Sequence, residues 1–160
     1  MKSFFHYLAI LAVFLVVSWW QTRGLLSTEN SPAPYFSLPT LQQPELRFSI
    51  KALQGKKTVL YFFAPWCAVC RYSMPNLEKR YRDGSINAVA IALDYQSIAE
   101  VEAFTRDLGL SMPVLLGSNN TTSDYRINGF PTYYVVNEEL MIISRSVGYS
   151  TELGLAVRSW

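Results

Sequence analysis

Residues 58–70 read TVLYFFAPWCAVC, an apolar run followed by the only two cysteines of the chain, Cys67 and Cys70. The stretch that follows, to about Arg82, is typical of a helix. A strand that delivers a C-x-x-C motif to the first turn of a helix places the first sulfur at the positive end of the helix dipole, where a thiolate is stabilised. We therefore expect Cys67 to be the nucleophile. Cys70, three residues later on the same helix face, is close enough to form a disulfide with it.

A structural disulfide and half of a zinc site are the two alternatives for this pair. Zinc needs about four ligands, and the only histidine, His6, lies in an apolar N-terminal segment. A bridge across so short a loop would remove little entropy from the unfolded chain, about 1 to 2 kcal/mol. The sequence favours a redox-active disulfide, and predicts neither a metal nor a further cofactor.

The N-terminal segment Phe4 to Trp20 is almost unbroken in apolar residues, with Lys2 before it and Arg23 after it. Its length, roughly 17 residues, is at the lower limit for crossing a bilayer core of about 30 Å. We predict an uncleaved membrane anchor over residues 1–23. A cleaved signal peptide is the alternative, for which Val16-Val17-Ser18 is a poor cleavage site.

Residues 24–33 are rich in Ser, Thr, Glu, Asn and Pro, a composition that predicts a flexible tether before a folded domain over 34–160. An anchor and a C-x-x-C pair agree on one location, a single-pass protein of the cytoplasmic membrane with its catalytic domain on the periplasmic, extracytoplasmic side. A net charge of +2, without basic runs that alternate with aromatics, argues against a nucleic-acid partner.

Strand and helix signals alternate within the domain. After the motif helix, which Asp83-Gly84 ends, Ile86 to Leu93 predicts a buried strand, and a capping box at Ser97–Glu100 begins a helix that Gly109 closes. Further elements are expected as strands at Leu46–Ile50 and Pro113–Leu116, a polar loop at 117–122, a helical turn near Ser123–Arg126, a hairpin of Thr132–Val136 and Leu140–Val147, and a last helix at Thr151–Trp160. The pattern predicts an α/β sandwich with a mixed central sheet.

Three features together resemble the thioredoxin superfamily: the C-x-x-C after a buried strand, Pro75 five residues past the second cysteine, and Gly129-Phe130-Pro131-Thr132 before the hairpin. The stretch APYFSLP at 33–39 and the helix-containing insert before Pro131 are similar to the membrane-anchored TlpA/ResA-like branch. The resemblance implies a thioredoxin-like three-layer sandwich preceded by one N-terminal transmembrane helix.

The resemblance also assigns roles to residues. Cys67 attacks, Cys70 resolves, and Phe130–Pro131 is a cis peptide bond beside the disulfide. The backbone of Phe130 would then pair with an extended substrate segment by strand addition. Trp66 would form the apolar wall beside the sulfurs, with a packing role as the alternative.

Two positions depart from the family pattern. Many thioredoxins have a buried aspartate six residues before the first cysteine, where this chain has Tyr61, and ResA-like members often have a glutamate where this chain has Ser73. No carboxylate is left to accept the Cys70 proton. Either Tyr61, a poor base at its usual pKa of about 10, holds a water in place, or a partner supplies the base.

The sequence thus predicts a membrane-tethered thiol:disulfide oxidoreductase that reduces protein disulfides and draws on a membrane electron donor. The direction follows from Ala68 and Val69, which offer neither charge nor a side-chain donor to the Cys67 thiolate. A thiol oxidant or isomerase is the alternative within the class. A copper-handling factor would need a distant histidine, which residues 34–160 lack, and a peptide-binding module would tolerate loss of the cysteines.

Overall fold

The computed structural model describes residues 31–151 without a gap, together with 24–28, Gly154 and positions 6–8, 10, 12, 13, 16 and 17. Among these residues, no helix is both long and apolar enough to cross a membrane. Much of the predicted anchor, Phe4 to Trp20, lies outside the described residues. So does most of the predicted helix at Thr151–Trp160.

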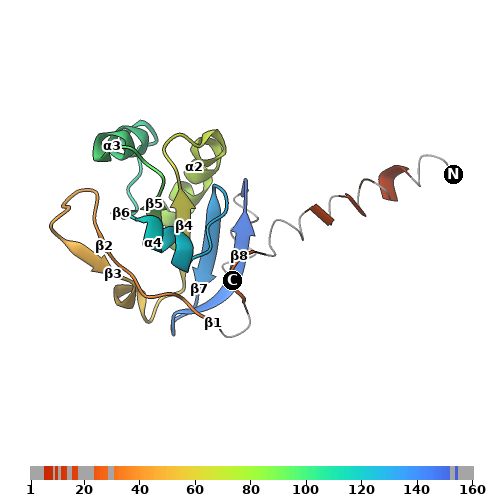
Figure 1. The fold of residues 1–160 in the computed structure, drawn as a ribbon, viewed down its shortest axis with the longest axis horizontal. Coiled ribbons are helices and arrows are strands. Elements are labelled where there is room, and N and C mark those ends of the chain that lie inside the picture. Colours follow the sequence, from red (N-terminus) through yellow and green to blue (C-terminus); the bar gives the residue numbers. More distant parts are fainter. Residues whose placement is uncertain are drawn as a thin grey trace.

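A mixed six-stranded sheet forms the centre of the domain, with strand order β1-β8-β7-β4-β5-β6 (Figure 1). Its strands are β1 (Ser31–Pro32), β4 (Thr58–Phe63), β5 (Asn87–Ala92), β6 (Val114–Leu116), β7 (Thr132–Val136) and β8 (Met141–Val147). β4, β5 and β6 run parallel, whereas β7 is antiparallel to both β4 and β8. The predicted central strands, the C-terminal hairpin and the mixed sheet are confirmed.

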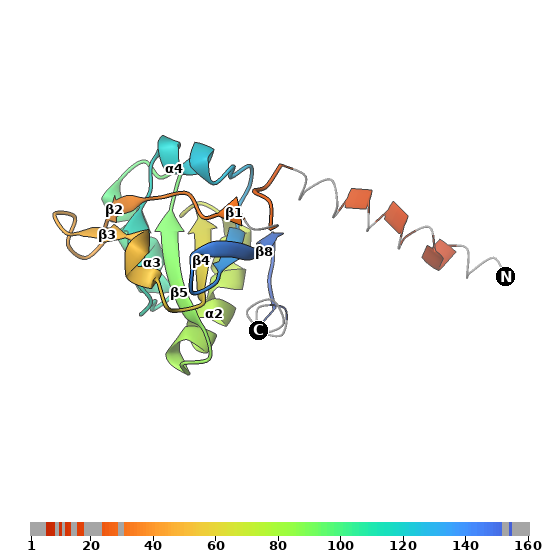
Figure 2. The ribbon, with the colours of Figure 1, turned by 90° about the horizontal axis from the view of Figure 1, so that it is seen from below.

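Both faces of this sheet are covered, and β4 shows why its sequence is an unbroken apolar run. Tyr61 and Phe63 point into one core, which α2 (Ala68–Arg82) and α3 (Ile98–Asp107) cover. Leu60 and Phe62 point into the other core. Figure 2 shows α2 on one face of the sheet and α4 (Asn119–Asp124) on the other, so the predicted three-layer arrangement is confirmed.

The two longer helices begin where the sequence predicted. Cys67 is the N-cap of α2, and Asp83 ends the helix before Gly84, which has a positive φ of 76°. Ser97 caps α3, its hydroxyl oxygen accepting the Glu100 N–H at 3.3 Å. The Glu100 carboxylate reaches back to the N–H of Gln96 at 3.0 Å, one residue earlier than in a standard capping box.

The segment before β4 differs from the prediction of an edge strand at Leu46–Ile50. β3 (Arg47–Ser49) pairs with β2 (Ser37–Pro39) in a separate two-stranded sheet, and a 3-10 helix (Ile50–Leu53) follows. Among the described residues, one isolated β-bridge, between Thr40 and Leu115, joins this segment to the main sheet.

The domain also begins earlier than Pro34. β1 adds to the edge of β8, and Leu25 is buried in the core beneath α4. The guanidinium of Arg145 donates to the carbonyl oxygens of Leu25, at 2.9 Å, and Leu26. The Leu26 N–H donates to the Tyr134 hydroxyl at 3.2 Å. The described part of the expected tether, 24–33, is therefore packed on the domain.

Residues 117–122, expected as a polar loop, instead contribute to α4. The Thr121 hydroxyl accepts the Ser118 N–H at 3.2 Å, so the polar composition that suggested a loop supplies the cap of a short helix. The helical turn predicted near Ser123–Arg126 is confirmed: Ser123 and Asp124 are the last residues of α4, and the Tyr125 and Arg126 N–H groups donate to the carbonyls of Thr121 and Ser123.

Candidate active site

The cysteine pair lies at the N-terminal end of α2, just past the carboxyl end of β4. Cys67 and Cys70 are joined as a disulfide with their Cα atoms 5.2 Å apart. Cys67 is 6% exposed and Cys70 is fully buried. An incoming sulfur atom can therefore approach only Cys67, which agrees with the predicted order of attack.

The sulfur of Cys67 occupies the position of a helix-capping oxygen. It accepts the backbone N–H of Cys70 at 3.1 Å. The first N–H groups of a helix have no partner within the helix, and they carry its positive dipole end. When the disulfide is reduced, this geometry stabilises negative charge on Cys67.

The loop before β7 contains the second element of the site. The Phe130–Pro131 peptide bond is cis, as the resemblance implied. The Pro131 carbonyl accepts the Gly148 N–H at 2.8 Å, and the Thr132 hydroxyl donates to the Gly129 carbonyl at 2.8 Å. Within the described residues, neither the N–H nor the C=O of Phe130 forms a hydrogen bond. Both groups remain available to an extended chain.

Trp66 connects the two elements. Its ring meets that of Phe130 edge-on, with centroids 5.8 Å apart. The indole N–H donates to Asp94, to the carbonyl at 2.9 Å and to the carboxylate at 3.2 Å. The ring is thus held in a fixed position although most of it is exposed, so it is not simply a core packing residue.

Tyr61 is fully buried beneath the helix, and burial raises the pKa of its hydroxyl well above the usual value. The Ser73 hydroxyl lies close enough to offset part of this shift, although Tyr61 Oη has no hydrogen bond within 3.5 Å. The hydroxyl of Tyr61 is therefore neutral at physiological pH. The two family carboxylate positions are occupied here by two neutral hydroxyl groups.

The carboxylate nearest along α2, Glu78, does not replace them. It is buried about two turns past Cys70 and accepts hydrogen bonds from the Arg82 side chain and from the backbone of Ser111 and Met112. No group of three or more His, Cys, Asp or Glu side chains that could hold a metal ion is found in the described part of the chain.

Comparison with known proteins places the chain in a family. Residues 30–145 match the model of the AhpC/TSA family. The chain belongs to this thioredoxin-like family.

Three relatives of this AhpC/TSA protein illustrate the likeness. It is 32% identical over 128 residues to the thioredoxin-like protein YneN of Bacillus subtilis, covering 78% of this chain and 74% of the relative. It is 28% identical over 130 residues to the thiol-disulfide oxidoreductase ResA of Oceanobacillus iheyensis, covering 78% and 67%. The crystal structure of StoA from Bacillus subtilis superposes with a TM-score of 0.69 at 26% identity, covering 80% and 98%. The predicted superfamily is confirmed, and the predicted enzyme class is that of these relatives.

Two parts of the AhpC/TSA protein's site were missed from the sequence. Asp94, which follows β5 and holds Trp66, gave only the weak signal of a polar residue at the carboxyl end of a strand next to β4. Tyr149, which follows β8 and contacts α2 through Asn76, gave no signal. Both depend on contacts between segments that are distant in the sequence.

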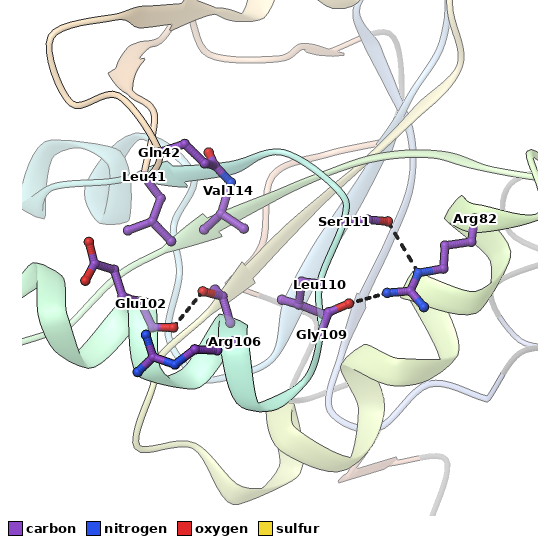
Figure 3. Close-up of a pocket in the computed structure, with 10 residues that line it drawn as sticks. Leu41, Gln42, Arg82, Glu102, Arg106, Gly109, Leu110, Ser111 and Val114 are labelled. Carbon is purple, nitrogen blue, oxygen red and sulfur yellow. Dashed lines mark hydrogen bonds between the residues drawn. The ribbon is translucent and has the colours of Figure 1, made fainter.

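A pocket of about 540 Å³ lies away from this chemistry (Figure 3). It opens beside the C-terminal ends of α2 and α3 and is lined by Arg82, Glu102, Arg106 and Ser111 among others. It includes no residue of the C-x-x-C motif or of the Phe130-Pro131 loop.

Proposed function

We propose that the chain is a membrane-tethered, extracytoplasmic thiol:disulfide oxidoreductase that reduces protein disulfides through Cys67 and Cys70. One observation carries the proposal: the slightly exposed sulfur of Cys67 accepts a helix N-terminal N–H, and its disulfide partner Cys70 is buried behind it. A purely structural bridge would need neither feature.

The reaction consists of two exchanges. The Cys67 thiolate attacks one sulfur of the substrate disulfide, forming a mixed disulfide and releasing the other substrate sulfur as a thiolate. Cys70 then loses its proton and attacks the Cys67 sulfur. The Cys67–Cys70 disulfide forms and the second substrate thiolate leaves, so two electrons have passed from the protein to the substrate.

The Cys70 proton has no carboxylate acceptor within the described residues around it. The first exchange, however, has just produced a substrate thiolate at the same surface. We infer that this departing thiolate takes the proton, directly or through water. A thiolate of ordinary pKa, about 8.5, is a better acceptor at neutral pH than the buried, neutral Tyr61 hydroxyl.

The reducing direction rests on the residues around the Cys67 sulfur. Ala68 and Val69, exposed between the two cysteines, bring no charge or side-chain donor. Arg71, the next residue, pairs with Asp107 at 3.4 Å and stacks over Phe104. The thiolate is thus stabilised mainly by the helix, and a less stabilised reduced form makes a more reducing couple. In an oxidising compartment such a protein needs a membrane electron donor.

Two observations support the proposed membrane tether: the apolar segment Phe4 to Trp20, and the attachment of the residues that follow it to the domain. Leu25 and Leu26 are fixed to Arg145 and Tyr134. Only a few residues separate this attachment from the apolar segment, so a membrane anchor there would keep the domain close to the bilayer surface. Carbonate washing of membranes should leave the chain attached, whereas a soluble form starting near Trp19 would show a cleaved signal.

Equilibration of the full chain in detergent with glutathione buffers tests the direction. We expect a reduction potential near the roughly −270 mV of thioredoxin. A value above about −170 mV would place the protein with isomerases and oxidants and would overturn the reductase proposal. Cys70→Ser expressed in the native host should meanwhile retain substrates as mixed disulfides for identification.

A further inference from the structure

Asn128 is the only asparagine of the chain that is followed by a glycine. It lies in the loop between α4 and β7, outside any helix or strand, and its side chain is exposed. An asparagine followed by glycine can close a ring on itself, because the glycine nitrogen can reach the side-chain carbonyl carbon and no Cβ hinders its approach. The sequence thus places a chemically reactive pair directly before Phe130.

Both reacting groups of this pair are free of hydrogen bonds within the described residues. The Asn128 side chain has no hydrogen-bond partner there, and the Gly129 N–H donates to no acceptor. The amide nitrogen of Asn128 lies against Gly24, where an added Cβ would come within 2.6 Å of it, but the two residues form no hydrogen bond. Ring closure therefore breaks no hydrogen bond of the fold.

The other described asparagines lack this combination. Three of them have side chains held by hydrogen bonds: Asn76, Asn87 and Asn137. Asn119 and Asn120 begin α4, where the helical backbone disfavours ring closure, and neither is followed by glycine. The structure thus singles out Asn128 among the described asparagines.

The loop is fixed on both sides of the reactive pair. The Ile127 N–H donates to the Thr122 carbonyl at 2.9 Å, and the Thr132 hydroxyl donates to the Gly129 carbonyl at 2.8 Å. Ile127 is also buried. An extra backbone atom between these two fixed points adds about 1.5 Å of chain and must move the loop. Phe130 follows directly, so it would be displaced.

The reaction consists of two steps and changes no oxidation state. The Gly129 nitrogen attacks the side-chain carbonyl carbon of Asn128, a C–N bond forms, and the amide nitrogen of Asn128 leaves as ammonia with the proton that the Gly129 nitrogen gives up. Water then opens the resulting cyclic imide at one of its two carbonyl carbons. One opening gives aspartate, and the other gives isoaspartate, in which the backbone runs through the side-chain carbon.

We propose that Asn128-Gly129 is a self-modification site, and that the isoaspartate formed there slows disulfide exchange by displacing Phe130. The only co-reactant is water, so the fraction of slowed protein increases with the age of the molecule. The modification itself does not depend on the proposed function, whereas its effect on exchange rests on it.

The test follows the purified full chain in detergent during incubation in warm, mildly alkaline buffer. Mass spectrometry of proteolytic fragments should show that Asn128 gains the mass by which OH exceeds NH₂, while Asn76, Asn87 and Asn137 stay intact. The protein is then fully reduced and mixed, in a single turnover, with a peptide that contains one internal disulfide. We expect a slow phase, about tenfold slower or more, because displacement of a substrate-aligning group by about 1 Å can cost this much. Its amplitude should equal the isoaspartate fraction.

Two variants and a repair reaction make the outcome specific. Gly129→Ala adds a Cβ beside the attacking nitrogen, at a position with no atom within 4 Å and without a left-handed φ, so it should fold and keep its own initial rate during incubation. Freshly prepared Asn128→Asp has the new charge without the extra backbone atom and should exchange within about twofold of fresh wild type. An isoaspartyl methyltransferase with its methyl donor converts isoaspartate to aspartate and should remove the slow phase from incubated wild type.

If Asn128 stayed intact while a free peptide of residues 126–131 deamidated in the same buffer, the fold would prevent ring closure and the proposal would be wrong. An isoaspartate fraction that reduced the peptide as fast as unmodified protein would equally overturn it. If fresh wild type did not reduce the peptide at all, the proposed function would fail, and the effect on exchange with it. Conversion at Asn128 would then still be decided by mass alone.

Discussion

The two ends of α2 differ in whether their polar and apolar groups are satisfied within the protein or left exposed. At the C-terminal end, Glu78 is buried and both of its carboxylate oxygens are used: Arg82 and Ser111 donate to one and the Met112 N–H to the other. Arg82 also reaches the Gly109 carbonyl, as Figure 3 shows. At the N-terminal end, Cys67 keeps a slight exposure of 6%, and Val69 and Tyr72 extend into solvent.

We infer from this difference that the C-terminal end of α2 contributes mainly to stability and the N-terminal end mainly to function. The C-terminal end is completed by the chain itself, and it joins α2 to the segment that leads into β6. The N-terminal end leaves apolar area and Phe130 backbone groups without a partner, which costs stability that a bound substrate would restore. Substitutions at one end should therefore change the free energy of unfolding, and substitutions at the other should change disulfide exchange.

The largest expected effect is at Cys67. Cys67→Ser removes the more exposed of the two cysteines and should abolish disulfide exchange, whereas Cys70→Ser should accumulate mixed disulfides because resolution fails. In the reduced wild type, Cys67 should alkylate faster than Cys70 and have a pKa below the free value of about 8.5, because the helix N-terminus stabilises its thiolate. Mass spectrometry of briefly alkylated protein reports the order, and faster labelling of Cys70 would reverse the assignment.

Glu78 provides the matching test at the opposite end. Glu78→Ala leaves the N–H groups of Ser111 and Met112 without acceptors and should destabilise the protein by about 2 to 4 kcal/mol. Denaturant unfolding of the full chain in detergent measures this loss.

If the two ends of α2 act separately, folded Glu78→Ala protein should carry out disulfide exchange at close to the wild-type rate. Arg82→Ala is the control: it removes a largely exposed partner and should cost less. If exchange fell tenfold while the fold persisted, the two ends of the helix would not be separable.

The bounds of β4 and α2 could be predicted from the sequence because their signals are local. The apolar run of β4, the C-x-x-C motif and Asp83-Gly84 define a strand and a helix by periodicity and capping, whatever the rest of the chain does. The family resemblance added the Phe130-Pro131 loop, whose place beside the helix no local pattern indicates.

The remaining features depend on contacts between segments that are far apart. Trp66 and Asp94 are 28 residues apart and Asn76 and Tyr149 are 73 apart, and each pair meets only because the sheet brings its strand ends together. The docking of Leu25 onto Arg145 spans 120 residues, so composition alone predicted a free tether. Polar residues at 117–122 likewise suggested a loop until Ser118 and Thr121 were seen to cap a helix.

A substitution at Tyr61 tests the buried side of the N-terminal end of α2, and its expected effect on stability is smaller than that of Glu78→Ala. Its hydroxyl is buried without a hydrogen bond, so Tyr61→Phe removes an unsatisfied group and should leave stability unchanged or raise it by about 1 kcal/mol. Exchange should stay within about twofold, since a hydroxyl whose pKa is raised by burial carries no proton away from Cys70 at neutral pH.

Ser73→Ala is the matched control for Tyr61→Phe. It deprives the Ser150 N–H of its acceptor and should be destabilising by about 1 kcal/mol. A tenfold loss of exchange in Tyr61→Phe would restore the tyrosine as part of proton transfer.

The smallest effect is expected at Asp83, at the C-terminal end of α2. The Ser85 hydroxyl, and then the Ser85 N–H at 2.9 Å, hold the pKa of this exposed carboxyl below its usual range. A carboxyl whose pKa is lowered by folding contributes stability above its unfolded pKa of about 3.9 and loses that contribution as the pH falls through the folded value. Asp83→Ala should therefore lower the unfolding temperature slightly at pH 7 and by less at pH 2, and Asp83→Asn, which keeps an acceptor for Ser85, should lower it less. An equal difference between Asp83→Ala and the wild type at both pH values would mean that ionisation plays no part. The C-terminal end of the helix would then owe its stability to the neutral contacts and to Glu78 alone.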